Sequence, residues 1–359
     1  MADPRDIRFI TSSDGVQIAT AKYGSGPLLL KAATWLTHIE HAPAGTMHAA
    51  LIDEFSRSNT YVEYDTRGCG LSQRHVQDIS FEAWVRDLEA VADSYGDKKF
   101  VLLGFTCAAG VAVEYAARHP ERVSHLILFG GYATSYHSTS HPDPAVRREG
   151  DLMLELAAVG WGSSSPAFRQ VFAARLLPDA TPAQWAAFDK LQRETATADV
   201  AVRHLRALYS LNVKQAAARV RCPTLVLHPK DDEMVRFEQG RRLASLIPGA
   251  RFVPVQGRNH IPFPDEPAWA GFVHETHQFL GHAPALEASP QLCGIHLTPR
   301  QAEVLSRVAH GQTDKQIAKD MSLSPRTVQM HVAGALKTLG CKNRTEAAHR
   351  ATSGRLLTA

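Results

Sequence analysis

One stretch of sequence governs the fold of most of this chain: Val101-Leu102-Leu103-Gly104-Phe105-Thr106-Cys107-Ala108-Ala109-Gly110. Its first half is an apolar run of strand length, and its second half begins a helical pattern that ends at Arg118-His119-Pro120. No loop sequence separates the two halves, so the strand must enter the helix through one sharp turn. A turn of this kind exposes the side chain of its central residue at the edge of a sheet.

Outward from this stretch, short apolar runs alternate with longer helical patterns up to about residue 280, which is typical of a mostly parallel sheet covered by helices. Residues from Thr134 to about Val220 contain amphipathic segments and no strand pattern, and they are predicted to form a helical lid. The predicted strands are Val16–Tyr23, Pro27–Ala32, Asn59–Tyr64, Phe100–Gly104, Leu126–Gly130, Thr224–His228 and Ala250–Pro254.

Three polar residues stand at points where a hydrolytic site needs them. Gly104-x-Thr106-x-Ala108 is close to the motif G-x-S-x-G, an acid, Asp232, follows the strand that begins at Thr224, and His260 lies on a later loop. On these residues, and on Tyr64–Ser72, Ala117–Val123 and Ile247–Ala250, residues 7 to about 280 resemble the α/β-hydrolases. The resemblance implies an α/β fold with a helical lid, and it places Thr106, Asp232 and His260 in the positions of nucleophile, acid and histidine.

Threonine at the first of these positions is expected to impair acyl transfer. The turn holds its central residue in a strained backbone conformation that a β-branched side chain tolerates poorly, and the extra methyl group obstructs a carbonyl carbon. Cys107 is the alternative nucleophile, since a thiol beside a histidine can be activated. That register would put Phe105 where a small residue is needed, and Cys107 is otherwise a small buried residue that offers a backbone N–H to an oxyanion.

A pocket for a small molecule is expected above Thr106. The lid supplies the aromatic residues Tyr136, Trp161, Phe168, Phe172, Trp185, Phe188 and Tyr209, of which two or three are expected to touch a ligand. The predicted ligand-binding residues are Thr34, Trp35, Phe105, Thr106, Cys107, Tyr132 and His260. No cofactor and no metal site is predicted, because the five cysteines are widely separated and never in C-x-x-C spacing.

The end of the chain differs in charge and pattern from the rest. Residues 281–294 contain two prolines and no regular spacing of apolar residues. They are predicted to be a linker between domain 1–280 and domain 295–359. The second domain has a formal charge of +6, against −3 for everything before it. Capping sequences at Thr298, Thr313, Ser324 and Asn343 predict four helices, in the manner of a helix-turn-helix module.

These residues, from Leu297 to Ala351, resemble the LuxR/GerE-type DNA-binding domain over its whole length. The resemblance implies a small all-α module that binds double-stranded DNA as a homodimer, with the last helix, about Thr345–Ala351, at the dimer contact. The residues expected to meet DNA are Lys315, Ser324, Arg326, Thr327, Gln329, His331 and Lys337, with Arg326 and Gln329 as candidates for base edges. Asp314 and Gly334 depart from the family pattern, and each removes attraction for phosphate. A helical oligomerisation module that touches no DNA is the alternative.

The amino-acid composition excludes several classes of protein. The 359 residues are 44% hydrophobic and 21% charged, which excludes a mainly disordered or fibrous chain. No apolar run of membrane-spanning length and no secretory leader is seen, so no membrane contact and a cytoplasmic setting are expected. The favoured function is a transcription regulator that senses a small molecule in a degenerate hydrolase pocket. An active esterase or lactone hydrolase, and a regulator whose hydrolase-like domain is only structural, are the alternatives.

Overall fold

A computed structural model describes residues 6–281 apart from 35–36, 42–44, 139–143, 162, 164 and 166, and residues 298–347 apart from 310–311, 322, 340, 342 and 345–346. The chain divides into two compact units, Met1–Gly281 and His282–Ala359. The predicted linker falls almost wholly outside the described residues, as does most of the predicted last helix.

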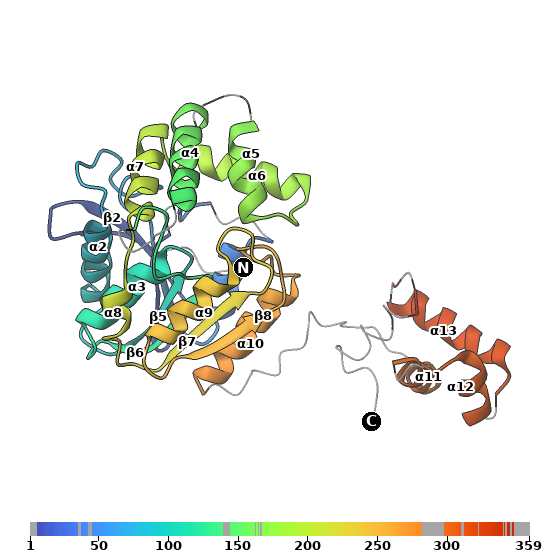
Figure 1. Cartoon of the computed structure of the whole chain (residues 1–359). Helices are drawn as coiled ribbons and strands as arrows, with labels where there is room; N and C mark the ends of the chain where they lie inside the picture. Colours follow the sequence, from blue (N-terminus) through green and yellow to red (C-terminus); the bar gives the residue numbers. More distant parts are fainter. Residues whose placement is uncertain are drawn as a thin grey trace. The chain divides into compact units, whose positions relative to one another are not determined.

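The larger unit contains an eight-stranded sheet in the order β1-β2-β4-β3-β5-β6-β7-β8. Figure 1 labels β2 and β5 to β8 of this sheet. The pairs β1/β2 and β2/β4 are antiparallel, and all other neighbours are parallel. This confirms the predicted mostly parallel sheet. The strands are β1 (Asp6–Thr11), β2 (Gln17–Tyr23), β3 (Leu28–Lys31), β4 (Thr60–Tyr64), β5 (Phe100–Phe105), β6 (Val123–Phe129), β7 (Thr224–Pro229) and β8 (Arg251–Val255).

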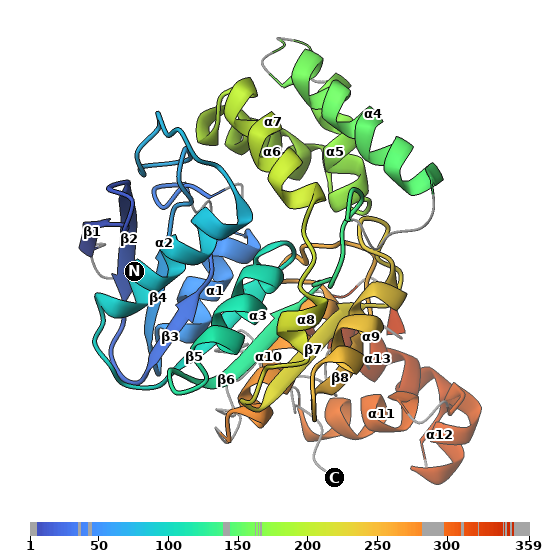
Figure 2. The same cartoon turned by 60° about the vertical axis from the view of Figure 1, so that its left-hand side comes forward.

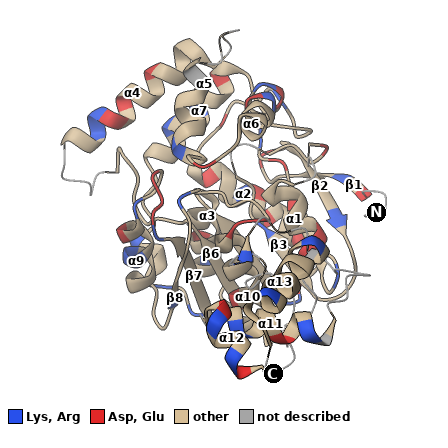
Figure 3. Ribbon diagram, turned by 90° about the vertical axis from the view of Figure 1, so that its right-hand side faces the viewer, with Lys and Arg blue, Asp and Glu red and all other residues tan. Residues whose placement is uncertain are grey.

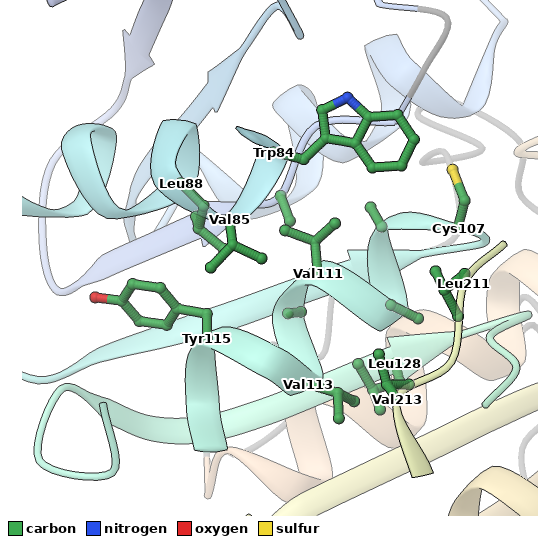
Figure 4. Packing of buried hydrophobic residues seen from close by; sticks show 14 of the residues in the cluster. Trp84, Val85, Leu88, Cys107, Val111, Val113, Tyr115, Leu128, Leu211 and Val213 are labelled. Atoms are coloured by element: carbon green, nitrogen blue, oxygen red, sulfur yellow. The ribbon is translucent and has the colours of Figure 1, made fainter. Parts of the chain in front are cut away.

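Helices cover both faces of the sheet (Figure 2). One face carries α2 (Phe81–Asp93), α3 (Ala108–Arg118), α8 (Lys214–Ala217) and α9 (Phe237–Leu246), and the other carries α1 (Met47–Phe55) and α10 (Pro267–Phe279). The central strands are buried on both sides, which explains why β5 reads as an unbroken apolar run. On the first face, side chains of α2 and α3 meet above the sheet, and Cys107 lies at the start of α3 (Figure 4).

The segment between β6 and β7 forms the predicted helical lid (Figure 1). Its helices are α4 (Pro144–Gly160), α5 (Ala167–Leu176), α6 (Pro182–Thr195) and α7 (Ala198–Tyr209). The prediction of no strand holds in the described part of the lid, apart from an isolated bridge between Thr134 and Asn212. A capping box at Thr181 begins α6, and Thr197 caps α7.

Strand β1 is the element that the sequence analysis missed. It pairs with β2 at the edge of the sheet, and none of its residues is fully buried. Ile7 and Ile10 pack against the apolar cores but are only partly buried, and Phe9 is 60% exposed. The apolar pattern of this edge strand is therefore weaker than the continuous runs by which the central strands were predicted.

The loop after β4, which carries Asp65 and Gly70, folds around a buried carboxylate. One oxygen of Asp65 accepts hydrogen bonds from the backbone N–H groups of Leu71 (2.8 Å) and Ile39 (3.2 Å). Gly70 has φ +51°, and a Cβ atom built on it would lie 2.1 Å from that oxygen. Both the backbone conformation and the space at this position therefore require glycine.

We predict that Gly70→Ala lowers the free energy of unfolding by about 2–4 kcal/mol, because strain and steric overlap add. The matched control is Gly249→Ala, at a position with φ +70° and no neighbouring atom within 4 Å, which should lose only about 1 kcal/mol. Urea unfolding of the full chain, followed by tryptophan fluorescence, measures this unit alone because all five tryptophans precede residue 282. Equal losses in the two variants would contradict the packing described for Gly70.

The same loop predicts a pH dependence. Burial raises the pKa of Asp65 to about 6, against the backbone hydrogen bonds from Leu71 and Ile39, which lower it. Because the folded-state pKa is raised, the contribution of Asp65 to stability is complete below about pH 4 and is lost as the pH rises through 6. The difference in stability between the wild-type chain and Asp65→Asn should therefore fall by about 3 kcal/mol between pH 4 and 7. The exposed carboxylate of Asp53, changed to Asn, is the control, and a parallel course of the Asp65→Asn and wild-type curves would refute the prediction.

The smaller unit is built from α11 (Pro299–Ala309), α12 (Asp314–Asp320) and α13 (Pro325–Leu339). Val304, Ile317, Val328 and Val332 form the centre of its apolar core. Val328, Val332 and Ala335 recur at helical spacing and form the buried face of α13. The capping box predicted at Thr313 is present.

Three further observations bear on chemistry. The described cysteines, Cys69, Cys107, Cys222 and Cys341, are not joined by disulfide bonds. Among the described residues, no group of three or more His, Cys, Asp or Glu side chains is placed to hold a metal ion. None of the described helices combines the length and the apolar character needed to cross a membrane.

Candidate functional site

Thr106 stands at the turn between β5 and α3. Its φ of +51° is the only positive φ of a non-glycine residue in the described part of the chain. The turn is held by a hydrogen bond from the backbone N–H of Thr106 to the carbonyl oxygen of Phe129 (2.8 Å). A Cβ atom on Gly104 would approach the backbone of Ala109 to 2.8 Å, so the helix can start this close to the strand only because residue 104 is glycine. A β-branched residue in this backbone region is a strained element, and such elements cluster at functional sites.

Asp232 and His260 form a buried pair near this turn. His260 Nδ1 lies 2.6 Å from one carboxylate oxygen of Asp232, and the other oxygen accepts the backbone N–H groups of Met234 and Val235, both at 2.9 Å. Burial acts to raise the pKa of Asp232, but the charge of His260 and hydrogen bonds from His228 and His260 outweigh it and hold that pKa well below its usual value. Asp232 is thus an ionised acceptor that fixes the orientation of the imidazole ring.

His228 is a third member of this group that the sequence analysis missed. It lies in β7 with its Nε2 atom 3.4 Å from the Asp232 carboxylate and 2.8 Å from the carbonyl oxygen of Val235. Because a carbonyl oxygen only accepts, Nε2 of His228 carries the hydrogen. The available signal was its position four residues before Asp232 at the end of a predicted strand.

The hydroxyl group of Thr106 is not engaged with His260. Its hydrogen bond goes to Cys107 Sγ (3.5 Å), and no hydrogen bond joins it to the His260 ring, both residues being in the described part of the chain. His260 is 1% exposed, and its backbone N–H donates to the carbonyl oxygen of Leu176 in the lid (2.9 Å). With Nδ1 held by Asp232, Nε2 is the ring nitrogen that this pair leaves available.

A cavity of about 350 Å³ lies over this group. Its lining includes Thr106, Cys107, Tyr132 and His260, four of the seven residues predicted to bind a ligand. The lid contributes Tyr136, Phe172 and Tyr209, three of the seven aromatic residues considered for this role. Trp35 lies outside the described residues, and so does the side chain of Phe168.

Two of the predicted ligand-binding residues do not line the cavity. Phe105 is fully buried on the opposite face of the sheet, where its ring contacts Phe129 and Phe272 at centroid distances of 5.4 and 5.2 Å. Its side chain points away because successive residues of a strand alternate between faces. Thr34 is part-buried and is not among the cavity residues in the described part of the chain.

Two charged lid residues in the cavity wall, Arg175 and Glu149, were not predicted, and they meet the predicted residue Tyr136. Arg175 Nη1 lies 2.6 Å from a carboxylate oxygen of Glu149, and its Nη2 atom donates to the hydroxyl group of Tyr136 (3.2 Å). All three residues line the cavity, and they come from α5, α4 and the loop after β6. No local sequence pattern marks Arg175 and Glu149. The packing of the lid decides which face of each lid helix meets the cavity.

The second unit carries a candidate nucleic-acid interface. The hydroxyl group of Ser324 accepts the backbone N–H of Thr327 (3.1 Å), so Ser324 caps α13 as predicted. The predicted DNA contacts all reach the surface of this unit: Lys315, Ser324, Arg326, Gln329 and Lys337 are exposed, and Thr327 and His331 are part-exposed. Met330 on α13 is also 61% exposed. The blue segments on the ribbon of α12 mark its lysine residues (Figure 3).

The two departures from the expected DNA-binding pattern have structural explanations. Asp314 accepts a hydrogen bond from Arg344 Nη1 (2.7 Å), and Arg344 also donates to the carbonyl oxygen of Gln312 (3.1 Å). The negative charge of Asp314 is thereby compensated inside the unit. Gly334 faces α11, and a Cβ atom on it would lie 2.7 Å from the side-chain amide of Gln301.

The two units match two protein families. Residues 44–267 match the family described as alpha/beta hydrolase fold, and residues 296–351 match the bacterial regulatory proteins of the luxR family. A 2-hydroxy-6-oxo-2,4-heptadienoate hydrolase of Pseudomonas putida is 27% identical over 244 residues, which cover 63% of this chain and 75% of that protein. A 2-hydroxymuconate semialdehyde hydrolase of the same species is 28% identical over 215 residues, covering 55% and 68%.

Among solved structures, an esterase from Exiguobacterium antarcticum shares the fold. It superposes with a TM-score of 0.64 at 21% identity and covers 76% of this chain and 98% of that one. The family matches and this structural similarity confirm the fold class predicted for both parts of the chain.

Proposed function

This chain belongs to the alpha/beta hydrolase fold family, and on that premise we propose that its larger unit binds a small carbonyl compound as the sensor of a DNA-binding regulator. The luxR-type domain makes the chain a DNA-binding regulator fused to a hydrolase-fold domain.

The observation that carries the proposal is Thr106 at φ +51° beside an intact pair of Asp232 and His260. A cavity, an oriented imidazole and a hydroxyl group are all that recognition of a carbonyl group needs. Acyl transfer also needs an unhindered nucleophile that hydrogen-bonds to the base. Here the nucleophile position holds a secondary alcohol whose hydrogen bond goes to Cys107 rather than to His260.

DNA binding by the smaller unit would use the exposed start of α13. Arg326 and Gln329 project near its N-terminal end and are proposed to contact base edges, and Lys315, Thr327, His331 and Lys337 to contact phosphates. Ser324 is proposed to lie at the same surface, where the first-turn amides of α13 attract phosphate. We further propose that two copies bind a two-fold symmetric site, as is usual for helix-turn-helix regulators.

A slow hydrolase is the second candidate, and one observation favours it. The separation of 2.6 Å between His260 Nδ1 and Asp232 is the geometry that a general base requires. The two Pseudomonas putida relatives are named as hydrolases of oxo and semialdehyde compounds. In this alternative an ester would acylate Thr106, or Cys107 in its place, and its alcohol would leave with the side-chain proton. Water would then hydrolyse the acyl group to a free acid.

The proposal is tested with the full chain and a duplex that it selects from a randomised DNA pool. A set of short esters, lactones and aromatic acids is screened for an increase in melting temperature, since a ligand at 100 times its Kd stabilises by about 2.7 kcal/mol. At least one compound should raise the melting temperature and change the affinity for the duplex about 5- to 150-fold. Both effects should be lost in His260→Ala.

Other outcomes separate the alternatives. A set without any stabilising compound would favour a purely structural hydrolase-like domain. A compound that stabilises the chain and leaves DNA affinity unchanged would contradict the proposed coupling. Steady turnover that vanishes in His260→Ala would favour the hydrolase.

A further inference from the structure

The hydroxyl group of Tyr209 is a buried polar group that nothing in the described part of the chain satisfies. Tyr209 ends α7, is 1% exposed and lines the cavity above Thr106. Its hydroxyl oxygen has no hydrogen-bond partner among the residues that the structure describes. Buried polar groups are nearly always paired in native structures, so an exception in a cavity wall points to a partner that binds there.

The surroundings of this hydroxyl group are polar but already balanced in charge. The ring of Tyr136 packs edge-on against Tyr209 at a centroid distance of 4.8 Å, and the ring of His137 does so at 5.8 Å. The charged groups that act on Tyr209 are Arg175 and Glu149, which form an ion pair with each other. An anion placed here would be repelled by Glu149, and the positive charge of Arg175 is already paired with that carboxylate.

The protonation of Tyr209 sets its role. Burial raises the pKa of Tyr209, with Tyr136 adding to the increase and Arg175 opposing it. The phenol therefore keeps its proton near neutral pH and can donate it to an oxygen acceptor. A neutral acceptor such as a ketone oxygen satisfies it without bringing a new charge.

We propose that the cavity recognises a two-ended neutral ligand, with one carbonyl group at Thr106 and His260 and a second oxygen acceptor that takes the hydrogen bond of Tyr209. This inference rests on the proposed function, because it assumes that the cavity binds a carbonyl compound. It adds a ligand class, dicarbonyl or keto-substituted chains, and a specificity-determining residue. The hydroxyl group is shielded from solvent, so the ligand oxygen reaches it by moving the neighbouring lid side chains.

Matched ketones test the inference without any bond cleavage. Binding of 2-hexanone, 2-octanone and 2-decanone to the full chain is compared by calorimetry with binding of 2,5-hexanedione, 2,7-octanedione and 2,9-decanedione. For the chain length that fits, the dione should bind about 10-fold more tightly than the monoketone. In Tyr209→Phe that preference should disappear, while the affinity for the monoketone stays the same.

Two controls separate ligand recognition from a structural role. Tyr115→Phe makes the same change at a buried tyrosine of α3 outside the cavity lining, and the preference for the dione should persist. In the absence of ligand, Tyr209→Phe should melt at the same or a higher temperature than the wild type, because it deletes an unsatisfied polar group. A lower melting temperature would show that the hydroxyl group has a structural partner and would overturn the inference.

The experiment distinguishes failure of this inference from failure of the proposed sensor function. Equal binding of monoketone and dione at every length would overturn the two-ended ligand and leave the proposed sensor intact. Persistence of the preference in Tyr209→Phe would overturn the role of Tyr209 alone. No binding of any ketone, together with no stabilising compound in the wider set, would count against both proposals.

Discussion

The variant Thr106→Ser is expected to hydrolyse p-nitrophenyl butyrate at least about 100-fold faster than the wild-type chain. Serine lacks the methyl group that obstructs the approach of a carbonyl carbon, and it tolerates the backbone at φ +51° better than a β-branched residue. The base is already in place, since His260 is oriented by Asp232 at 2.6 Å. Correctly placed general-base catalysis contributes about 10²–10⁴-fold in rate.

The control is the double variant Thr106→Ser, His260→Ala, which should lose the gain. Release of p-nitrophenol under steady-state conditions measures both. If Thr106→Ser remains as slow as the wild type while it binds substrate, the obstacle to acyl transfer lies elsewhere in the cavity. The reading of Thr106 as the residue that limits catalysis would then be wrong.

The second large effect is expected in DNA binding. Arg326→Ala should weaken binding of the selected duplex by about 10- to 100-fold, or about 1–3 kcal/mol, and relax the base preference at one position of each half-site. Arg326 is exposed near the start of α13, from which a side chain can reach a base edge. Fluorescence anisotropy with the selected duplex and with single-base variants of it measures both quantities.

Two lysines of α12 provide the matched comparison. Lys315→Ala should weaken binding of all duplexes alike and reduce the slope of log K against log salt by about 1, as expected for a phosphate contact. Lys319→Ala removes the same charge from the same helix at a position outside the predicted contacts, and it should change the affinity less. Binding that does not depend on salt would exclude the DNA role of this unit.

The elements that the sequence predicted well are those whose pattern is local. The strands β5 and β7 are buried on both faces and read as apolar runs, and Ser324 and Thr313 cap their helices through bonds within one turn. The edge strand β1 is only partly buried, and its apolar residues Ile7, Phe9 and Ile10 do not form a continuous run, so its signal is weaker.

In the candidate site, too, some residues could be predicted from the sequence and others could not. Asp232 and His260 could be predicted because their order along the chain is characteristic, although 28 residues separate them. Phe105 does not line the cavity although it precedes Thr106 in the sequence, because the alternation of faces along a strand directs its side chain to the opposite core. Arg175 and Glu149 could not be predicted, since their approach to the cavity is a property of lid packing over long sequence distances. For the same reason the sequence offered Tyr209 only as one of seven lid aromatic residues, without showing which of them reach the cavity.

The central claim is that the larger unit binds a carbonyl compound without turning it over. It is tested most directly by the release of p-nitrophenol from excess p-nitrophenyl butyrate by the purified wild-type chain, followed over many enzyme equivalents beside Thr106→Ala. The wild type is expected to release no more product than Thr106→Ala, beyond at most one equivalent. Sustained release by the wild type that is abolished in Thr106→Ala would contradict it.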